Sequence, residues 1–220
     1  MKTFYQTLMC ILLLSLTACF ELRQEVWILP NGQGRAKIDF GMEQKLVALI
    51  ESSSKAKGSK PSPFSSSELK KTEKTMKKNP NVVAAKATSF AENDLQYLSL
   101  DYTTKNFTQI YEINEDSMQN ANLNNGAVFK KISDTEFEMT YSLQSTNPSS
   151  SSNKMTKEEK ANMQAMFGDH QITLTFHAPK ILKTNGKKVD EQTVQFAIPF
   201  AKMNEQKKGM EWKVRFSTEE

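Results

Sequence analysis

Polar and apolar residues alternate with a period of two along much of this chain, which is typical of strands that bury one face of a β-sheet. The first two alternating segments are residues 21–29 and 35–40. Between them, residues 30–34 contain an Asn-Gly pair and a second glycine, which suit a tight reversal. The two segments are therefore predicted to form a β-hairpin.

The same alternation predicts further strands later in the chain. They are expected at residues 82–90, 95–102, 127–132, 135–144, 171–178, 193–198 and 211–216, with turns between most consecutive pairs. Short turns between neighbouring strands favour antiparallel pairing.

Apolar spacing and capping residues together predict four helices. Met42 to about Ser53 is predicted to be an amphipathic helix, and a capping box formed by Ser65 and Glu68 opens a polar helix to about Lys78. Thr104 is expected to cap a short helix, and a helix opened by Thr156 is stopped by Gly168. The predicted fold class is α+β: a largely antiparallel β-sheet built from consecutive hairpins, with several amphipathic helices packed on one face.

The N-terminus has the three parts of a secretory signal: Lys2, an apolar run from about Leu8 to Leu16, and small residues after it. The run is shorter than the roughly 20 residues that span a bilayer. Leu16-Thr17-Ala18-Cys19 matches the bacterial lipobox, in which the cysteine thiol takes a diacylglycerol by thioether linkage. The alternative is an ordinary signal with an incidental cysteine; Cys10, inside the apolar run, is interpreted as discarded with the signal.

These motifs predict the domain organisation and the location. Residues 1–18 are expected to be a lipoprotein signal peptide, and residues 19–220 a single α+β domain with a flexible Ser/Lys-rich insertion near 52–67. Acyl chains at Cys19 would hold the protein at a membrane permanently. By the sorting rule for such lipoproteins, Phe20 in place of Asp after the cysteine favours the outer membrane of a Gram-negative cell envelope.

Composition narrows the choice of partner. Cleavage after Ala18 removes Lys2 from the 29 basic residues and none of the 25 acidic ones, so the formal charge falls from +4 to +3. Such a small surplus does not predict a nucleic-acid binder. The stretch Lys55–Lys78 holds eight lysines against two glutamates, which predicts either a solvated face or a contact with anionic lipid. With Cys19 acylated, no disulfide can staple the fold.

The two ends of the chain resemble the LppM-type lipoprotein domain. The opening hairpin follows the lipobox at once, and Phe176–Lys180, Thr184-Asn185-Gly186 and Thr193–Phe196 resemble the strand, turn and strand of that family. The resemblance implies an envelope lipoprotein with a mixed α/β domain that handles lipids or glycolipids. It leaves residues 55–166 without correspondence, transfers no binding residue, and differs from mycobacterial members in lacking an evident C-terminal spanning segment.

No catalytic or cofactor motif is present in the sequence. A Gly-x-Ser-x-Gly elbow and a phosphate-binding glycine loop are both missing. His170 and His177 lie seven residues apart around one strand, so they point to opposite faces and cannot share a metal ion. The prediction is a protein that is not an enzyme and has no metal or cofactor.

Two hypotheses for function remain open. The first is a lipid-anchored envelope protein that binds a lipid-like ligand or an envelope protein partner. The second is a structural or assembly accessory whose basic segment contacts anionic lipid or a protein partner. Trp27 and Trp212 alternate with core residues, which favours packing in a core or interface over lining a hydrophobic groove.

Overall fold

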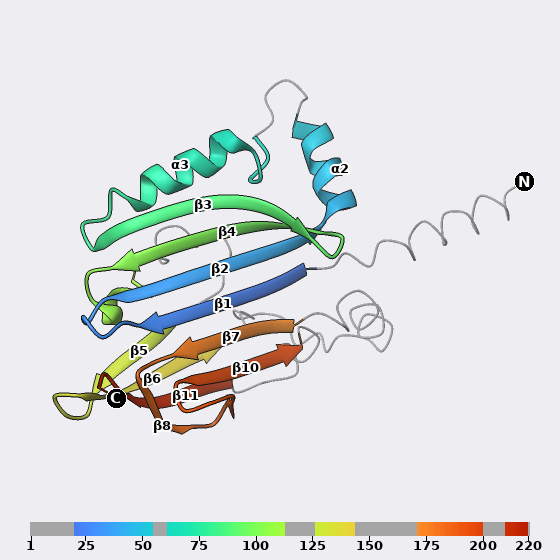
Figure 1. Ribbon diagram of the computed structural model, residues 1–220. Helices are drawn as coiled ribbons and strands as arrows, with labels where there is room; N and C mark the ends of the chain where they lie inside the picture. The colour runs from blue at the N-terminus through green and yellow to red at the C-terminus, as the bar shows by residue number, and fades with distance from the viewer. Residues whose placement is uncertain (1–19, 55–60, 113–125, 144–170, 200–209, 220) are drawn as a thin grey trace, which may run out of the picture.

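Strands make up most of the domain (Figure 1). The computed structural model describes residues 20–54, 61–112, 126–143, 171–199 and 210–219. The strands are β1 (Phe20–Ile28), β2 (Gly34–Glu43), β3 (Val82–Glu92), β4 (Leu95–Thr104), β5 (Gly126–Lys131), β6 (Glu136–Leu143), β7 (Gln171–His177), β8 (Lys180–Thr184), β9 (Lys187–Lys188), β10 (Thr193–Pro199) and β11 (Met210–Ser217). The helices are α2 (Gln44–Ser54), α3 (Ser66–Met76) and a short 3₁₀ helix η1 (Phe107–Gln109).

Seven strands form the larger sheet, in the order β3-β4-β2-β1-β7-β10-β9. The predicted hairpin is confirmed: β1 pairs antiparallel with β2, and Ile28 lies opposite Gly34. On its other side β1 runs parallel to β7, with Val26 opposite Phe176. This parallel pair joins the N-terminal and C-terminal parts of the chain into one sheet.

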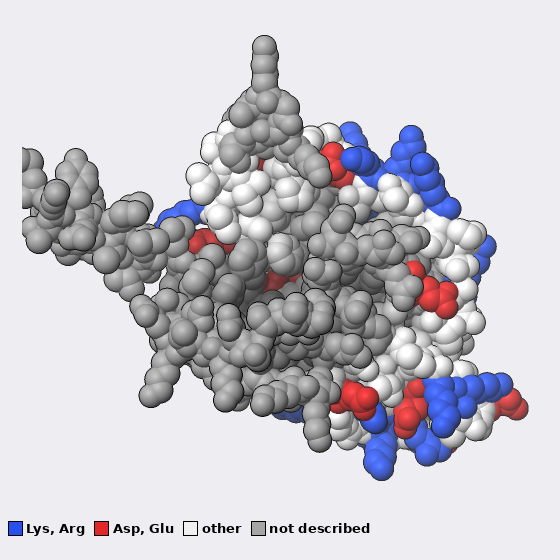
Figure 2. Space-filling model, turned by 180° about the vertical axis from the view of Figure 1, so that it is seen from behind, with Lys and Arg blue, Asp and Glu red and all other residues white. Residues whose placement is uncertain are grey.

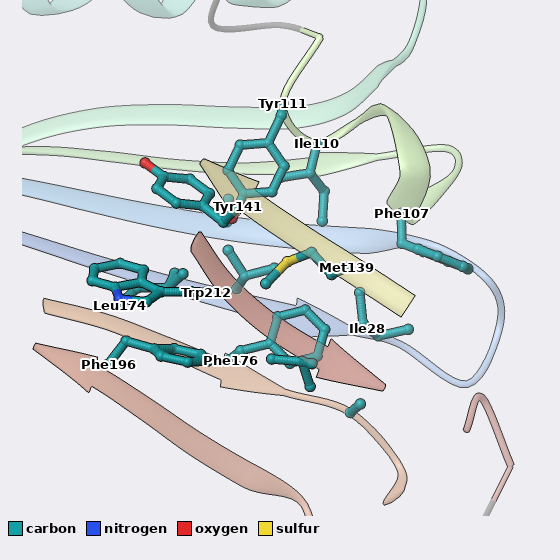
Figure 3. Packing of buried hydrophobic residues seen from close by; sticks show 14 of the residues in the cluster. Ile28, Phe107, Ile110, Tyr111, Met139, Tyr141, Leu174, Phe176, Phe196 and Trp212 are labelled. Atoms are coloured by element: carbon teal, nitrogen blue, oxygen red, sulfur yellow. The ribbon is translucent and has the colours of Figure 1, made fainter. Parts of the chain in front are cut away.

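The remaining strands form a four-stranded sheet in the order β5-β6-β11-β8. In Figure 1 this sheet lies behind the half of the larger sheet that contains β1, β7 and β10. The space between the sheets is filled by buried apolar side chains, several of which Figure 3 labels. They include Val26, Ile28, Leu174, Phe176, Val194, Phe196, Met139, Tyr141, Trp212, Val214 and Phe216.

Aromatic rings close one end of this core. Phe107, on η1, meets Phe137 and Phe216 edge to face, with ring centroids 5.0 and 5.9 Å apart. Burying such a side chain contributes roughly 1.5–3 kcal/mol. The core therefore comes from two sheets facing each other, with η1 at its margin.

The predicted fold class is wrong about what packs against the sheet. The described chain is mainly β, with two sheets packed face to face and two α-helices, in place of one sheet carrying several amphipathic helices on one face. The reason is that half of the larger sheet buries its inner face against the second sheet and needs no helix there. Of the expected helices, the one opened by Thr156 lies outside the described residues.

The helices cover the other half of the larger sheet. α3 begins after Ser65, whose Oγ accepts a hydrogen bond from the Glu68 backbone N–H at 3.4 Å, as the capping box predicted. It lies along β3, and the Glu73 carboxylate accepts from the backbone N–H of Ala87 at 3.4 Å. This contact shields an edge strand from pairing with another chain.

Two predicted helix starts are wrong. Met42 belongs to β2, so α2 begins two residues later than expected, at Gln44. Thr104 ends β4, and its hydroxyl donates to the Gly34 carbonyl at 3.2 Å. Asn106 caps η1 instead, because its side-chain oxygen accepts from the Thr108 backbone N–H at 3.0 Å.

The flexible insertion predicted near residues 52–67 is described only at its two ends. Residues 55–60 lie outside the described parts of the chain, while Ser54 ends α2 and Ser62 and Phe64 are buried before α3. Its flexibility therefore stays a prediction.

Candidate ligand-binding cleft

A cleft opens where the two sheets lose their edge partners. β9 has two residues, so its pairing with β10 covers only Val194 and Gln195. On the second sheet, β8 pairs with β11 only from Val214 onward. The neighbouring stretches, Phe196–Pro199 and Met210–Lys213, therefore have no described strand on that side, and a cleft of about 420 Å³ lies between them. Its lining is Asn185, Gly186, Lys187, Gln195, Phe196, Ala197, Met210, Glu211 and Trp212.

Two stacked rings form the floor of the cleft. Phe196 and Trp212 have ring centroids 5.1 Å apart and planes 17° from parallel. The other side of the Trp212 indole faces Tyr141 at 5.6 Å, and the three rings lie together in Figure 3. Both floor residues are buried to 4 % exposure, so the floor is part of the core between the sheets.

The floor continues inward to an unpaired hydroxyl. Tyr111 packs against Tyr141 at 5.4 Å between ring centroids, and no hydrogen-bond partner reaches the Tyr111 hydroxyl among the described residues. Burial raises the pKa of Tyr111 well above its usual value, so the group stays protonated. An unsatisfied buried hydroxyl costs about 1–3 kcal/mol. The aromatic series from Phe196 to Tyr111 therefore ends in a polar atom inside the core.

The Thr184-Asn185-Gly186 turn holds one wall of the cleft against both sheets. The Asn185 side chain donates to the Glu211 carbonyl at 2.8 Å and accepts from the Lys213 backbone N–H at 2.7 Å. These hydrogen bonds satisfy backbone groups of β11 that have no partner on β8. Gly186 lies against the Phe196 ring so closely that a Cβ there would be 2.4 Å from a ring carbon. This turn, one of the motifs on which the resemblance was based, thus holds the wall of the cleft in place by hydrogen bonds to β11 and by contact with Phe196.

The rim of the cleft is polar and mixed in charge. Lys187, Gln195 and Glu211 supply an ammonium group, an amide and a carboxylate. The Glu211 carboxylate is paired with the Lys213 ammonium group at 2.8 Å, which raises the pKa of Lys213. An apolar floor with a few polar rim groups suits an amphiphilic molecule.

A second hollow of about 460 Å³ lacks such a floor. It is lined by Pro179, Lys180 and residues 190–192, so its walls are charged and amide side chains and a proline ring. The first cleft is the better candidate for an apolar ligand.

The outer face of the larger sheet, opposite the second sheet, carries a row of stacked planar groups. Trp27 stacks on His177 with centroids 5.2 Å apart and planes 6° from parallel, and the Arg35 guanidinium lies 4.9 Å from the Trp27 ring centroid. Arg35 also makes two hydrogen bonds to Asp101, at 2.9 and 2.6 Å. Of the two tryptophans, Trp212 lies in the core, while Trp27 is half-buried on this outer face.

His177 is held in this row. Its Nδ1 lies 3.1 Å from the Thr193 hydroxyl, and its buried Nε2 has no described hydrogen-bond partner. Desolvation lowers the pKa of His177 below its ordinary 6.5, although Glu25 and Asp190 oppose the shift. His170 lies outside the described residues. Within the described ranges, no three His, Cys, Asp or Glu residues are placed to hold a metal ion.

Comparison with solved structures identifies a similar fold. The chain superposes on the folded domain of LppM from Mycobacterium tuberculosis, solved by NMR, with a TM-score of 0.51. The two are 10 % identical, and the match covers 91 % of each chain. No protein-family model and no curated protein matches the sequence. The resemblance seen at the two ends of the sequence thus extends through most of the chain as a likeness of fold.

The predicted site residue, Cys19, lies outside the described residues, one position before β1 begins at Phe20. Among the helices that the structure describes, none has the length and apolar character needed to cross a membrane. Sequence reasoning noticed the Thr184-Asn185-Gly186 turn but missed the cleft. No local pattern in the sequence indicates the cleft, because it depends on where β9 and β8 stop pairing with β10 and β11.

Proposed function

We propose that this chain is a non-enzymatic, lipid-anchored protein of the cell envelope that binds a lipid-like ligand in the cleft between β10 and β11. The observation that carries the proposal is the edge of the two sheets at which no described strand pairs, where Phe196 and Trp212 form an apolar floor under a polar rim. The lipobox supports the anchor, and the likeness to the LppM domain supports the fold.

The cleft suits an amphiphile because its two chemistries are separated. An acyl chain entering between the edges would lie against Phe196 and Met210, and each buried CH₂ contributes about 0.8 kcal/mol. The exposed Lys187 ammonium group at the rim would face an anionic or polar head group. The role of each side chain follows from its position on the floor or the rim.

Native mass spectrometry of the full chain, purified from membranes in mild detergent, tests ligand binding. Ala197 is exposed and lies at the margin of the cleft, beside the buried Phe196, so the indole of Ala197→Trp should obstruct the entrance while leaving the buried floor in place. Ala91, an exposed alanine on β3, gives the matched control Ala91→Trp. We expect a co-purified lipid in the wild type and the control and at least a tenfold lower occupancy in Ala197→Trp. A wild type free of lipid, or equal occupancy in all three, contradicts the proposal.

The anchor has its own test. Cys19→Ala should abolish incorporation of labelled palmitate and release the chain from the particulate fraction, because Cys19 is the proposed acylation site. Cys10→Ala should change neither result. Unlabelled wild-type protein, or firm membrane attachment of Cys19→Ala, would contradict the anchor. Outer-membrane placement in a Gram-negative cell, which rests on Phe20, is tested by separating the two membranes.

The non-enzymatic part of the proposal is tested at the histidines. Alanine at both His170 and His177 should leave any cellular phenotype of the protein intact. Loss of function in a double variant that still folds would favour catalysis.

The alternative is a structural or assembly accessory of the envelope that uses its basic segment. α3 favours it, because Lys70, Lys74 and the following Lys78 are exposed and no described carboxylate lies within ion-pair distance of their ammonium groups. A ligand-free chain whose Lys70→Gln and Lys74→Gln variant loses contact with anionic lipid or a protein partner would support this alternative.

A further inference from the structure

Lysines and exposed apolar side chains gather on the segment that forms β8 and β9. The chain reverses at the Thr184-Asn185-Gly186 turn, with β8 paired to β11 on one side of the turn and β9 paired to β10 on the other. This chain reversal, residues 180–191, is named the basic hairpin. It exposes Lys180, Lys183, Lys187 and Lys188, and no described carboxylate lies within ion-pair distance of them. Its acidic residues are Asp190, which accepts a hydrogen bond from the Gln192 backbone N–H at 2.8 Å, and Glu191. The basic hairpin thus contains four ammonium groups and two carboxylates.

The basic hairpin also exposes two large aliphatic side chains, Leu182 at 41 % and Val189 at 58 %. Figure 2 shows Lys and Arg at the upper and lower margins of the domain, with Asp and Glu interspersed at the lower margin. Cations beside exposed aliphatic groups suit the boundary between phospholipid head groups and acyl chains.

The strand order fixes where the basic hairpin lies relative to the proposed anchor. β1, which follows Cys19, is the central strand, with three strands on each side of it. β9 is therefore about 14 Å from β1 across the sheet. Along the strands, Lys188 is level with Val194, Phe176 and Val26, about 20 Å from Phe20.

α3 lies at the opposite edge, over β3. β3 and β9 are opposite edges of the sheet, with β1 between them. A flat membrane surface in contact with the start of β1 can therefore also contact only one of these two edges. The β9 edge is favoured because Leu182 and Val189 are exposed there and because the cleft between β10 and β11 begins where β9 ends.

We propose that the basic hairpin is a second membrane contact, which docks on anionic phospholipid and turns the cleft toward the bilayer. The proposal rests on the lipid anchor of the proposed function. Each well-placed cation favours an anionic surface by roughly fivefold, so neutralising two should lower the equilibrium constant for docking about 25-fold. A single tether leaves the domain free to rotate, and the basic hairpin supplies the second point that fixes its orientation.

The test uses the full chain purified from membranes, reconstituted on phosphatidylcholine vesicles with and without phosphatidylglycerol. All variants carry Cys10→Ser, and a polarity-sensitive fluorophore is attached to one introduced cysteine. Leu182→Cys reports on the basic hairpin, and Ile132→Cys, a site of matching 40 % exposure in the turn between β5 and β6, is the control. Lys74→Cys reports on α3.

We expect a blue shift at residue 182 only with phosphatidylglycerol, and no shift at residues 132 or 74. Lys183→Gln with Lys187→Gln should abolish the shift, whereas Lys105→Gln with Lys130→Gln, an equal change of charge, should preserve it. A shift at residue 74 in place of residue 182 assigns docking to α3 and overturns the proposal. No shift at residue 182 overturns it as well, and leaves an acidic protein as the partner of the basic hairpin.

Intact mass separates the two proposals. A chain without covalently attached acyl groups contradicts the anchor. An acylated chain whose label at residue 182 does not shift contradicts only the docking. A shifted label on a chain whose cleft holds no lipid keeps the docking and rejects the ligand.

Discussion

Gly186→Ala should destabilise the protein by crowding the floor of the cleft. An added Cβ would lie 2.4 Å from one Phe196 ring carbon and 2.7 Å from a second, well inside contact distance. The ring cannot retreat freely, because its face stacks on Trp212. Overpacking of this kind costs about 1–3 kcal/mol. For a chain of this size each kcal/mol lowers the melting temperature by about 2–4 °C.

The assay is denaturant unfolding followed by near-ultraviolet circular dichroism, which reports on the packed aromatic rings. A double-mutant cycle with Phe196→Leu isolates the clash. In the leucine background Gly186→Ala should cost at least about 1 kcal/mol less than in the wild type, because the branched side chain leaves space at the ring edge. Gly186→Ala that costs the same in both backgrounds, or nothing in either, would refute the packing of the turn on Phe196.

Three further predictions concern titratable side chains. Tyr111→Phe should raise the free energy of unfolding by about 1 kcal/mol, because it removes an unsatisfied buried hydroxyl; chemical denaturation measures this, and a loss above 1 kcal/mol would mean that the hydroxyl has a partner. Since burial lowers the pKa of His177, the unfolded chain binds the proton more readily, so stability should fall as pH drops below about 6.5 and fall less in His177→Gln; identical pH profiles would contradict this. Arg35→Gln should raise the pKa of Asp101 toward 3.8, seen by NMR titration, with a stability loss of at most about 1 kcal/mol at neutral pH for this partly exposed pair; an unmoved Asp101 pKa would show that Arg35 does not hold it down.

Local pattern predicts local structure in this chain. The alternation and the Asn31-Gly32 turn locate the β1–β2 hairpin, and Gly32 has the positive φ of 79° that such a turn needs. The β5–β6 hairpin and the capping box before α3 also follow from short-range chemistry. Each of these depends on residues a few positions apart.

Long-range pairing explains what the sequence did not predict. Nothing in residues 20–28 or 171–177 specifies that β1 and β7 lie side by side in parallel, because each strand alternates equally well against any neighbour. A prediction that lacks this pair does not place the C-terminal strands, so it gives a single sheet whose apolar face only helices can cover. The core position favoured for Trp27 is wrong: Trp27 stands between the buried Val26 and Ile28, so its side chain points to the opposite face of the sheet, where it stacks on His177.

The cleft depends on the lengths of β8 and β9, which the alternation of polar and apolar residues does not indicate. β9 and β8 end early, so Phe196–Pro199 and Met210–Lys213 are left without described edge partners. Of the two floor residues, Trp212 is predicted from the sequence to pack in a core or interface and Phe196 only to lie in a strand; nothing in the sequence places the two rings together. A site built from missing edge pairs becomes visible only when the register of both sheets is known.

Photo-crosslinking with a diazirine-bearing phospholipid tests the central claim, ligand binding in the cleft, most directly. The full chain, labelled in vesicles and digested, should carry adducts on peptides that contain residues 195–197 and 210–212, and Ala197→Trp should remove them while Ala91→Trp retains them. Adducts confined to other peptides, or adducts that Ala197→Trp leaves unchanged, would contradict a lipid-binding cleft between β10 and β11.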